Sequence, residues 1–290
     1  MTGHSHDNID WDAHLQRLRD ADEFTAPEIA ELVGTLLRPT DRTVLEIGAG
    51  AGGTAAAFAS ALAETGGSVT IVDAAPQLLA AARSRAEQVC DRVAVRAVEA
   101  DAADDSLLDA VGAQADLVYA AFVVHHLPDQ LAALRRLAKL VRPGGRLAIV
   151  EFGLQTRVLP ADIGLGEPGL EARLIAAREE WFQQMRAGME GAVRLPVGWP
   201  TALSQAGLVD VHSWSYLVDR PAPLDDLGRA AVLRRLQLLR RDAETRVAPG
   251  DIEVLDQLLD ESGEHCAAHR DDVYYLTANT VHVGTRPQDG

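Results

Sequence analysis

The 290-residue chain has only two cysteines, Cys90 and Cys266, which lie far apart in the sequence. A framework of disulfide bonds is therefore not expected, and a reducing compartment suits the chain. Aromatic residues make up 4% of the sequence and lysine is nearly absent, while alanine, arginine, aspartate and leucine dominate. Because alanine suits most environments, single-residue propensities say little here, and the order of the sequence patterns has to carry the argument.

No uninterrupted apolar run is long enough to cross a bilayer, and the first twelve residues lack the apolar stretch of a secretory leader. We therefore expect a cytoplasmic protein without membrane contact. The formal net charge of -16 argues against a broad basic surface, so no nucleic-acid partner is expected. The acidic residues are scattered along the chain, as on a solvated surface.

Between residues 42 and 150, short β-branched runs alternate with stretches rich in alanine and leucine. This alternation predicts an α/β fold, with parallel strands joined by right-handed crossovers in a doubly wound sheet. Two helices are expected before the first strand, and a turn at residues 143–145 is expected directly before the strand Arg146–Val150. The predicted strands are Thr43–Ile47, Ser68–Val72, Val93–Val98, Asp116–Tyr119 and Arg146–Val150, and the helices between them are Gly53–Glu64, Pro76–Val89, Asp105–Val111 and Asp129–Leu140.

The alternation stops after Glu151, and no low-complexity linker divides the chain, so we expect one domain over residues 1–290. Later strands are expected at Leu208–Leu217 and Val273–Val283, with Asp251 capping a helix between them. The expected parts are the N-terminal helices 1–40, a core 41–152, a cap insertion 153–205, and C-terminal strands 206–290 with a helical insertion at 221–270.

A glycine-rich turn, Glu46-Ile-Gly48-Ala49-Gly50-Ala-Gly52, separates the first predicted strand from the next helix. Glycine permits positive φ and close approach of a ligand to the backbone, and the following helix offers free amides. Gly53 follows the Gly48-x-Gly50-x-Gly52 run, so the Gly-x-Gly-x-x-Gly spacing of nicotinamide-binding folds is also present, and the spacing alone does not separate the two classes of cofactor. The carboxylate of Glu46 would repel a pyrophosphate, but it suits a cationic sulfonium cofactor that carries an ammonium group.

Asp73 ends the second predicted strand and is followed by Ala74. A carboxylate in this place can accept hydrogen bonds from both hydroxyls of a ribose. Capping of the helix that begins at Pro76 is an alternative role, and the two roles are compatible.

These motifs resemble class I S-adenosylmethionine-dependent methyltransferases over roughly residues 40–152, and the longer pattern is similar to actinobacterial small-molecule members. The resemblance implies S-adenosylmethionine as cofactor and a Rossmann-like seven-stranded sheet with an antiparallel last strand and helical cap insertions. About fifty residues stand between the last two strands, where such enzymes often have a short hairpin. The matching segments are Val44-Leu-Glu-Ile-Gly-Ala-Gly50, Val72-Asp73, Glu99-Ala-Asp101-Ala102, Asp116 to Asp129 with its His125-His126 pair, and Val141-Arg-Pro-Gly-Gly-Arg-Leu147.

By the same resemblance, Asp101 would bond the exocyclic amine of adenine, with the amide of Ala102 at the ring. The carbonyl of Ala120 would hold the methionyl ammonium, and His126 would lie beside the methionyl end or the departing methyl group. The expected cofactor-binding set is Glu46, Gly48, Ala49, Gly50, Gly52, Asp73, Ala74, Asp101, Ala102, Ala120 and His126.

Methyl transfer is an in-line displacement, so positioning and desolvation supply most of the acceleration. A base is needed only when the acceptor must lose a proton. His125 and His126 follow the fourth strand, at the edge where open α/β sheets bind ligands, and either is a candidate general base. Support of the methionyl pocket and packing under the cap are the alternatives. Glu151, at the end of the fifth strand, faces the acceptor or serves as a capping or ion-paired carboxylate.

Trp181 and Met185 lie on one predicted helix of the cap insertion and are candidates for acceptor contact, with simple packing as the alternative. No metal is expected, because His265, Cys266 and His269 lack a fourth ligand nearby, and His4 and His6 are poor substitutes. The arginines between residues 234 and 241 are expected to form ion pairs.

We therefore expect a methyltransferase that acts on a small organic acceptor at O, N or C, in secondary metabolism. A homologue that binds the cofactor without methylating, as a cyclase or a regulatory protein, is the alternative. A nucleic-acid or protein methyltransferase is disfavoured by the acidic charge and by Ala120-Ala-Phe-Val123, where an Asn-Pro-Pro-Tyr motif would stand. Apolar faces on the two insertions could form a homodimer.

Overall fold

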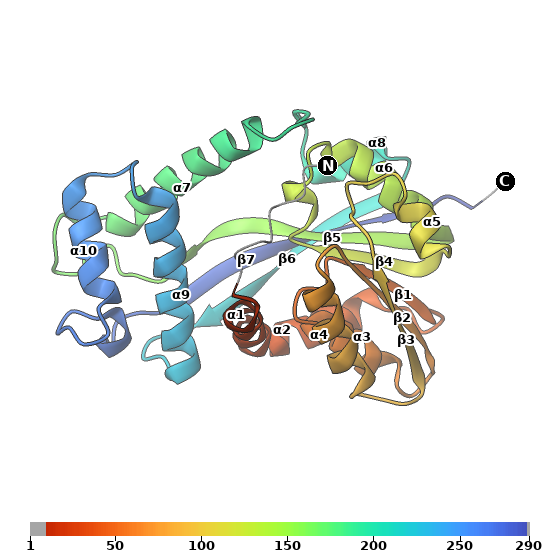
Figure 1. Ribbon diagram of the computed structural model, residues 1–290, viewed down its shortest axis with the longest axis horizontal. Coiled ribbons are helices and arrows are strands. Elements are labelled where there is room, and N and C mark those ends of the chain that lie inside the picture. Colours follow the sequence, from red (N-terminus) through yellow and green to blue (C-terminus); the bar gives the residue numbers. More distant parts are fainter. Residues whose placement is uncertain (1–9, 289–290) are drawn as a thin grey trace. The chain divides into compact units, whose positions relative to one another are not determined.

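The computed structural model describes residues 10–288, and Figure 1 labels its elements. His4, His6 and the first nine residues of the segment tested for a leader lie outside the described residues. The strands are β1 (Thr43–Ile47), β2 (Gly67–Asp73), β3 (Val93–Glu99), β4 (Ala115–Ala121), β5 (Val141–Arg157), β6 (Val209–Arg220) and β7 (Tyr275–Thr285). The helices are α1 (Trp11–Phe24), α2 (Ala26–Leu36), α3 (Gly53–Leu62), α4 (Pro76–Glu87), α5 (Leu107–Val111), α6 (Gln130–Leu140), α7 (Leu170–Ala187), α8 (Trp199–Gln205), α9 (Asp226–Ala243) and α10 (Pro249–Leu259), with short 3₁₀ turns η1 (Val124–His126) and η2 (Ala267–His269).

The seven strands form one sheet in the order β3-β2-β1-β4-β5-β7-β6. The pairs β2–β3, β1–β2, β1–β4 and β4–β5 are parallel. β7 runs antiparallel to β5, since the Gly144 amide donates to the Arg286 carbonyl at 2.9 Å while the Tyr274 amide donates to the Val158 carbonyl at 3.2 Å. The predicted doubly wound sheet with an antiparallel last strand is confirmed.

Helices cover both faces of the parallel strands, as Figure 1 shows. Successive residues of β1 pack on opposite faces of the sheet. Val44 lies in the core under α2, α3 and α4, and Leu45 lies in the core under α5, α6 and α8. Residues that alternate along a strand point to opposite faces of the sheet, so a strand buried on both sides reads as a continuous apolar run. This explains why Val44 to Ile47 contains only one polar residue, Glu46.

Two details of the later chain differ from the predictions. β5 begins at Val141 and ends at Arg157, so residues 143–145 lie inside the strand and Glu151 is not its end. The extra residues are absorbed where the β4–β5 register shifts, with Gly144 at a φ of 77°. Asp251 is not a helix cap: Ala248 holds that position, and Asp251 lies in the first turn of α10 and pairs with Arg173 at 2.7 Å.

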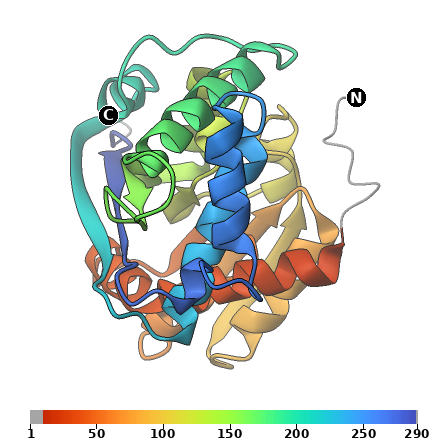
Figure 2. The ribbon, with the colours of Figure 1, turned by 90° about the vertical axis from the view of Figure 1, so that its left-hand side faces the viewer.

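The described contacts divide the chain into two compact units. Within the described residues, unit 1 comprises residues 10–152, 190–216 and 280–288, and unit 2 comprises residues 153–189 and 217–279. Figure 2 shows the green helix α7 beside the blue helices of unit 2, and Arg178 of α7 pairs with the buried Asp242 of α9 at 3.1 Å. The expectation of one domain stays a prediction.

The arginine-rich helix α9 forms ion pairs. Arg240 pairs with Asp256 at 2.7 Å, and Arg241 pairs with Asp242 at 2.8 Å. Among residues 10–288 no helix is both long and apolar enough to cross a membrane.

One buried ion pair fastens the segment before β1 to the sheet. The guanidinium of Arg146, on β5, pairs with Asp41 and donates to the carbonyl of Leu36 at 2.5 Å. Asp41 also accepts a hydrogen bond from the Arg38 amide at 2.8 Å. Removal of one partner would leave the other charge buried and uncompensated.

We predict that Asp41→Ala lowers the free energy of unfolding by about 3–5 kcal/mol, because Arg146 keeps its buried charge without its carboxylate partner. Urea unfolding followed by circular dichroism measures this loss. Asp105→Ala is the matched control, since Asp105 is 97% exposed in its pair with Arg136, and it should cost less than about 1 kcal/mol. A double replacement, Asp41→Leu with Arg146→Met, should recover most of the loss. Equal losses of stability in Asp41→Ala and Asp105→Ala would contradict the prediction.

Candidate active site

The glycine turn after β1 is shaped by steric limits on both sides. Gly48, Gly50 and Gly52 have φ angles of 74°, 53° and 83°. A Cβ atom on Gly48 would lie 2.4 Å from a methyl carbon of Val123, and one on Gly52 would lie 2.4 Å from the Cα of Ala82. A Cβ on Gly50 would meet nothing within 4 Å, so the turn is closed at its two ends and open in the middle. A ligand can approach the backbone closely at Gly50.

Glu46 is buried directly before this turn, and within the described chain its Oε2 atom accepts no hydrogen bond. Burial, reinforced by the nearby carboxylates of Asp22 and Asp73, raises the pKa of Glu46 well above its usual value. A buried carboxylate without a partner is costly in a folded protein, and such groups cluster at binding sites. The carboxylates at this turn accept hydrogen bonds, so the site fits a cationic ligand with hydroxyl groups better than it fits a phosphate.

Asp73 supports the turn from the end of β2. Its carboxylate accepts hydrogen bonds from the amides of Ala75 at 2.9 Å and Gly50 at 3.4 Å. Burial raises the pKa of Asp73, and these backbone hydrogen bonds oppose the shift. The side chain is therefore held at the glycine turn and at the start of α4 together.

Asp22 was missed by the sequence reasoning. It lies on α1, accepts a hydrogen bond from the amide of Gly53 at 3.0 Å, and pairs with Arg85 at 2.6 Å. It thereby ties α1 to the first residue of α3, where the helix dipole favours a negative charge. Asp22 and Gly53 are 31 residues apart, and no local periodicity marks their pairing.

The other predicted cofactor residues follow neighbouring strands at the same edge of the sheet. β2 and β3 end in register, Asp73 opposite Glu99, so Asp101 and Ala102 come two and three residues beyond β3. The Asp101 carboxylate accepts the Ala103 amide at 2.8 Å in an exposed turn. The buried Ala120 stands near the end of β4, paired in register with Ile47. The edge thus gathers the predicted set from four strands.

His125 and Glu151 form a buried pair. The Nδ1 atom of His125 lies 2.6 Å from Oε2 of Glu151, and the His125 amide donates to Oε1 at 3.3 Å. Gln130 donates to the His125 carbonyl at 3.3 Å, which fixes the η1 turn to α6. The His126 ring lies 4.0 Å from the His125 ring. The sequence placed all three candidate catalytic residues at this edge, but it did not predict which histidine meets Glu151.

Two phenylalanines next to this pair were also missed. Phe122 follows β4 with a φ of 56°, and its ring lies 5.0 Å from the ring of Phe152 on β5. The Phe152 ring lies 5.0 Å from that of His125. Positive φ at a bulky residue cannot be read from a sequence pattern.

Trp181 and Met185 lie on α7 in unit 2, where both are half-buried and Arg241 lies 5.9 Å from the Trp181 ring centre. Their contact with an acceptor stays a prediction. In the part of the chain from Asp10 to Gln288, no three His, Cys, Asp or Glu side chains are grouped as metal ligands.

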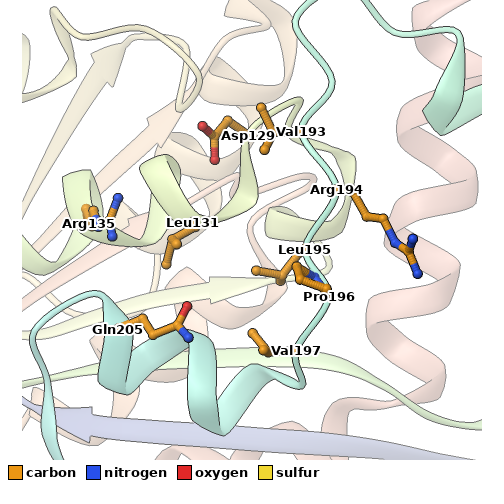
Figure 3. Close-up of a pocket in the computed structure, with 9 residues that line it drawn as sticks. All are labelled: Asp129, Leu131, Arg135, Val193, Arg194, Leu195, Pro196, Val197 and Gln205. Atoms are coloured by element: carbon orange, nitrogen blue, oxygen red, sulfur yellow. The ribbon is translucent and has the colours of Figure 1, made fainter.

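A pocket of about 280 Å³ lies between the start of α6 and the segment before α8 (Figure 3). Its wall is mainly apolar, from Leu131 on α6 to Leu195 and Val197 in the segment before α8, and Figure 3 shows Arg194 pointing away from them. The Val193 amide donates to the Pro128 carbonyl at 3.0 Å, which joins this segment to the histidine loop. None of the predicted cofactor residues lines the pocket.

Known proteins resemble this chain in sequence and in fold. The family model of a methyltransferase domain matches residues 45–147. A trans-aconitate 2-methyltransferase of Methylobacterium nodulans is 31% identical over 84% of this chain and 93% of its own length. A 27-O-demethylrifamycin SV methyltransferase of Amycolatopsis mediterranei is 32% identical over 62% of this chain, which spans 64% of that protein. An O-methyltransferase family protein of Burkholderia thailandensis has the same fold, with a TM-score of 0.54 at 17% identity, over 99% of this chain and 62% of its own.

The sheet and the glycine turn with its acidic neighbours define a class I fold for S-adenosylmethionine. The chain belongs to the methyltransferase domain family. The 31% identity with the trans-aconitate 2-methyltransferase, over 93% of that protein, shows this membership. The predicted family, fold class and cofactor are confirmed at this level. The chain spans about three fifths of the length of several curated relatives that it matches.

We predict that Glu46→Gln stabilises the ligand-free protein at pH 8. Because the pKa of Glu46 is raised in the folded state, the unfolded chain loses this proton first, and the folded protein is destabilised as the pH rises above about 4.3 toward the raised value. The gain in Tm should therefore shrink as the pH falls to about 4. Thermal unfolding from pH 4 to pH 8 measures it.

The same variant should bind S-adenosylmethionine about tenfold or more weakly, since the cationic ligand loses its charged partner. Glu99→Gln, an exposed neighbour at the end of β3, is the control and should change neither quantity. Unchanged affinity in Glu46→Gln would show that the buried carboxylate does not serve the ligand.

Proposed function

We propose that this chain is an enzyme that transfers the methyl group of S-adenosylmethionine to a small organic acceptor, which gives up a proton to the His125–Glu151 pair. The observation that carries the proposal is this buried pair, with Nδ1 2.6 Å from the carboxylate, at the sheet edge that holds the glycine turn. The cofactor supplies an activated methyl group on a sulfonium, so no further activation of the donor is needed.

The proposed binding residues divide the cofactor among them. Glu46 would offer its carboxylate to the cationic part of the cofactor. The glycine turn from Gly48 to Gly52 would let the cofactor approach the backbone closely. Asp73, with Ala74 beside it, would accept the ribose hydroxyls, and Asp101 and Ala102 would meet the adenine. Ala120 and His126 would hold the methionyl end. The raised pKa values of Glu46 and Asp73 support this proposal, because both carboxylates gain from a positive or hydrogen-bonding ligand.

His125 is suited to accept the proton of the acceptor through Nε2. Glu151 holds Nδ1, so it fixes the orientation of the ring and stabilises the cationic imidazole that forms. The main-chain bond from the His125 amide to Glu151 keeps the two residues together before the acceptor arrives. General-base catalysis of this kind contributes roughly 10²–10⁴-fold.

Small-molecule chemistry is supported by the relatives. The proteins named for trans-aconitate and for a rifamycin precursor both act on small organic compounds, and the second suits secondary metabolism. The net charge of -16 is unfavourable for a nucleic-acid acceptor. We further propose a cytoplasmic enzyme without membrane contact, in which a homodimer and acceptor contacts from Trp181 and Met185 are open to test.

We predict that the wild-type protein binds S-adenosylmethionine and S-adenosylhomocysteine, and that Asp73→Ala weakens both by about tenfold or more, because two ribose hydroxyls lose a charged acceptor. Isothermal titration calorimetry measures the affinities. Asp105→Ala removes an equal charge from an exposed side chain and should bind normally. Absence of binding by the folded wild type would refute the proposed function.

Glu151→Gln should lower kcat by about 10²–10⁴-fold for acceptors that must lose a proton, with cofactor affinity unchanged. Release of S-adenosylhomocysteine is measured with a panel of phenols, enols and carboxylic acids. The loss should be much smaller for acceptors that are already ionised at the assay pH, which separates a role in proton transfer from a structural one. Equal losses for both kinds of acceptor, or a lowered Tm that accounts for them, would argue against the base role.

A further inference from the structure

Phe122 adopts a backbone conformation that is costly for its residue type. Among the described residues, Phe122 and Asp210 are the two non-glycine residues with positive φ. The left-handed region brings the Cβ atom close to the carbonyl oxygen, and such strain persists where the surroundings hold it in place, often at functional sites. Here the Phe122 amide donates to the Val150 carbonyl at 2.9 Å, and the next residue, Val123, packs against Gly48.

The strained backbone directs the Phe122 ring toward β5. Its ring centre lies 5.0 Å from that of Phe152, and the Phe152 ring lies 5.0 Å from His125, which lies 4.0 Å from His126. We call these four side chains the aromatic row. Centre-to-centre distances of this size are typical of interacting aromatic rings.

The row runs from the buried His125 to the exposed Phe152. Glu151 is 1% exposed, whereas Phe152, the next residue on β5, is 56% exposed. A single exposed apolar residue needs no explanation. This one contacts the ring of Phe122, whose backbone is strained, and the ring of His125, which belongs to the pair that we propose as proton acceptor.

We propose that the aromatic row binds the acceptor, and that the acceptor is a planar conjugated ring compound with a hydroxyl of phenol-like acidity. This inference rests on the proposed function and specifies its substrate class. A flat ring gains from offset stacking on the row beyond the area it buries, whereas a saturated ring does not. A phenolic hydroxyl loses its proton near pH 10, within reach of a histidine base, and the row places such a group beside His125.

In this proposal, the strained backbone of Phe122 favours binding of the acceptor. Its ring is fixed before the acceptor arrives, so little side-chain freedom is lost on association. A glycine at this position would relax the backbone and remove the ring. An alanine would remove the ring and keep the strain, so the two variants separate backbone from ring effects.

The test uses a matched pair of probes on protein saturated with S-adenosylhomocysteine. Calorimetry compares 2-naphthol with decahydro-2-naphthol, which has the same carbon skeleton without the flat π system. Wild type should bind 2-naphthol about tenfold more tightly than the saturated alcohol. Phe152→Ala and Phe122→Gly should each weaken 2-naphthol binding by about tenfold and leave the saturated alcohol unchanged. Phe152→Tyr should retain tight binding.

Val209→Ala, which shortens another exposed apolar side chain of unit 1, is the control and should bind both probes as wild type does. Thermal unfolding identifies any variant that fails to fold, and Phe122→Ala reports on the ring with the strained backbone kept. Equal affinities for the two probes, no binding of either, or tight 2-naphthol binding by Phe152→Ala would overturn the inference. These outcomes leave the proposed function standing as long as S-adenosylhomocysteine binds; if it does not, the proposed function fails, and the probes are compared on the protein alone.

Discussion

Val123 packs so closely on Gly48 that a Cβ atom there would lie 2.4 Å from its methyl carbon, and the geometry of the site depends on this contact. Gly48 belongs to the turn that we propose as part of the cofactor site, and Val123 belongs to the loop that carries the two histidines. Any side chain at position 48 would push the two loops apart. Since methyl transfer depends on placing donor and acceptor in line, a displacement of about 1 Å between the loops would cost roughly 10²-fold in rate.

Three buried carboxylates differ in whether the protein supplies a partner for them. Asp41 pairs with the guanidinium of Arg146, and Glu151 is hydrogen-bonded to the ring and the amide of His125, so both have partners within the protein. Glu46 has no such partner, and burial, reinforced by two nearby carboxylates, raises its pKa. The uncompensated group is the one at the glycine turn. Stability is therefore lower where a cationic ligand can restore it, which is a common compromise between stability and function.

The sequence predicted the parts of the fold that depend on local periodicity. β1 begins and ends where expected, and the helices from α3 to α6 lie within two residues of the expected bounds. The sheet edge was also predictable, because the carboxyl ends of parallel strands meet there. Contacts between distant residues were not. Asp22 meets Gly53 across 31 residues, and the shift in the β4–β5 register depends on how two strands pack, so neither leaves a local signal.

The pairing of His125 with Glu151 bears on the chemistry more directly than the presence of two histidines does. Packing alone would be served by an apolar residue at position 151, since a buried polar pair is rarely more stable than a well-packed apolar one. A buried carboxylate that holds Nδ1 of an imidazole instead fixes the orientation of the ring. Positioning alone would need only a neutral acceptor such as a backbone carbonyl. The charge of Glu151 is therefore a feature that the proposed proton transfer uses and that neither packing nor positioning requires.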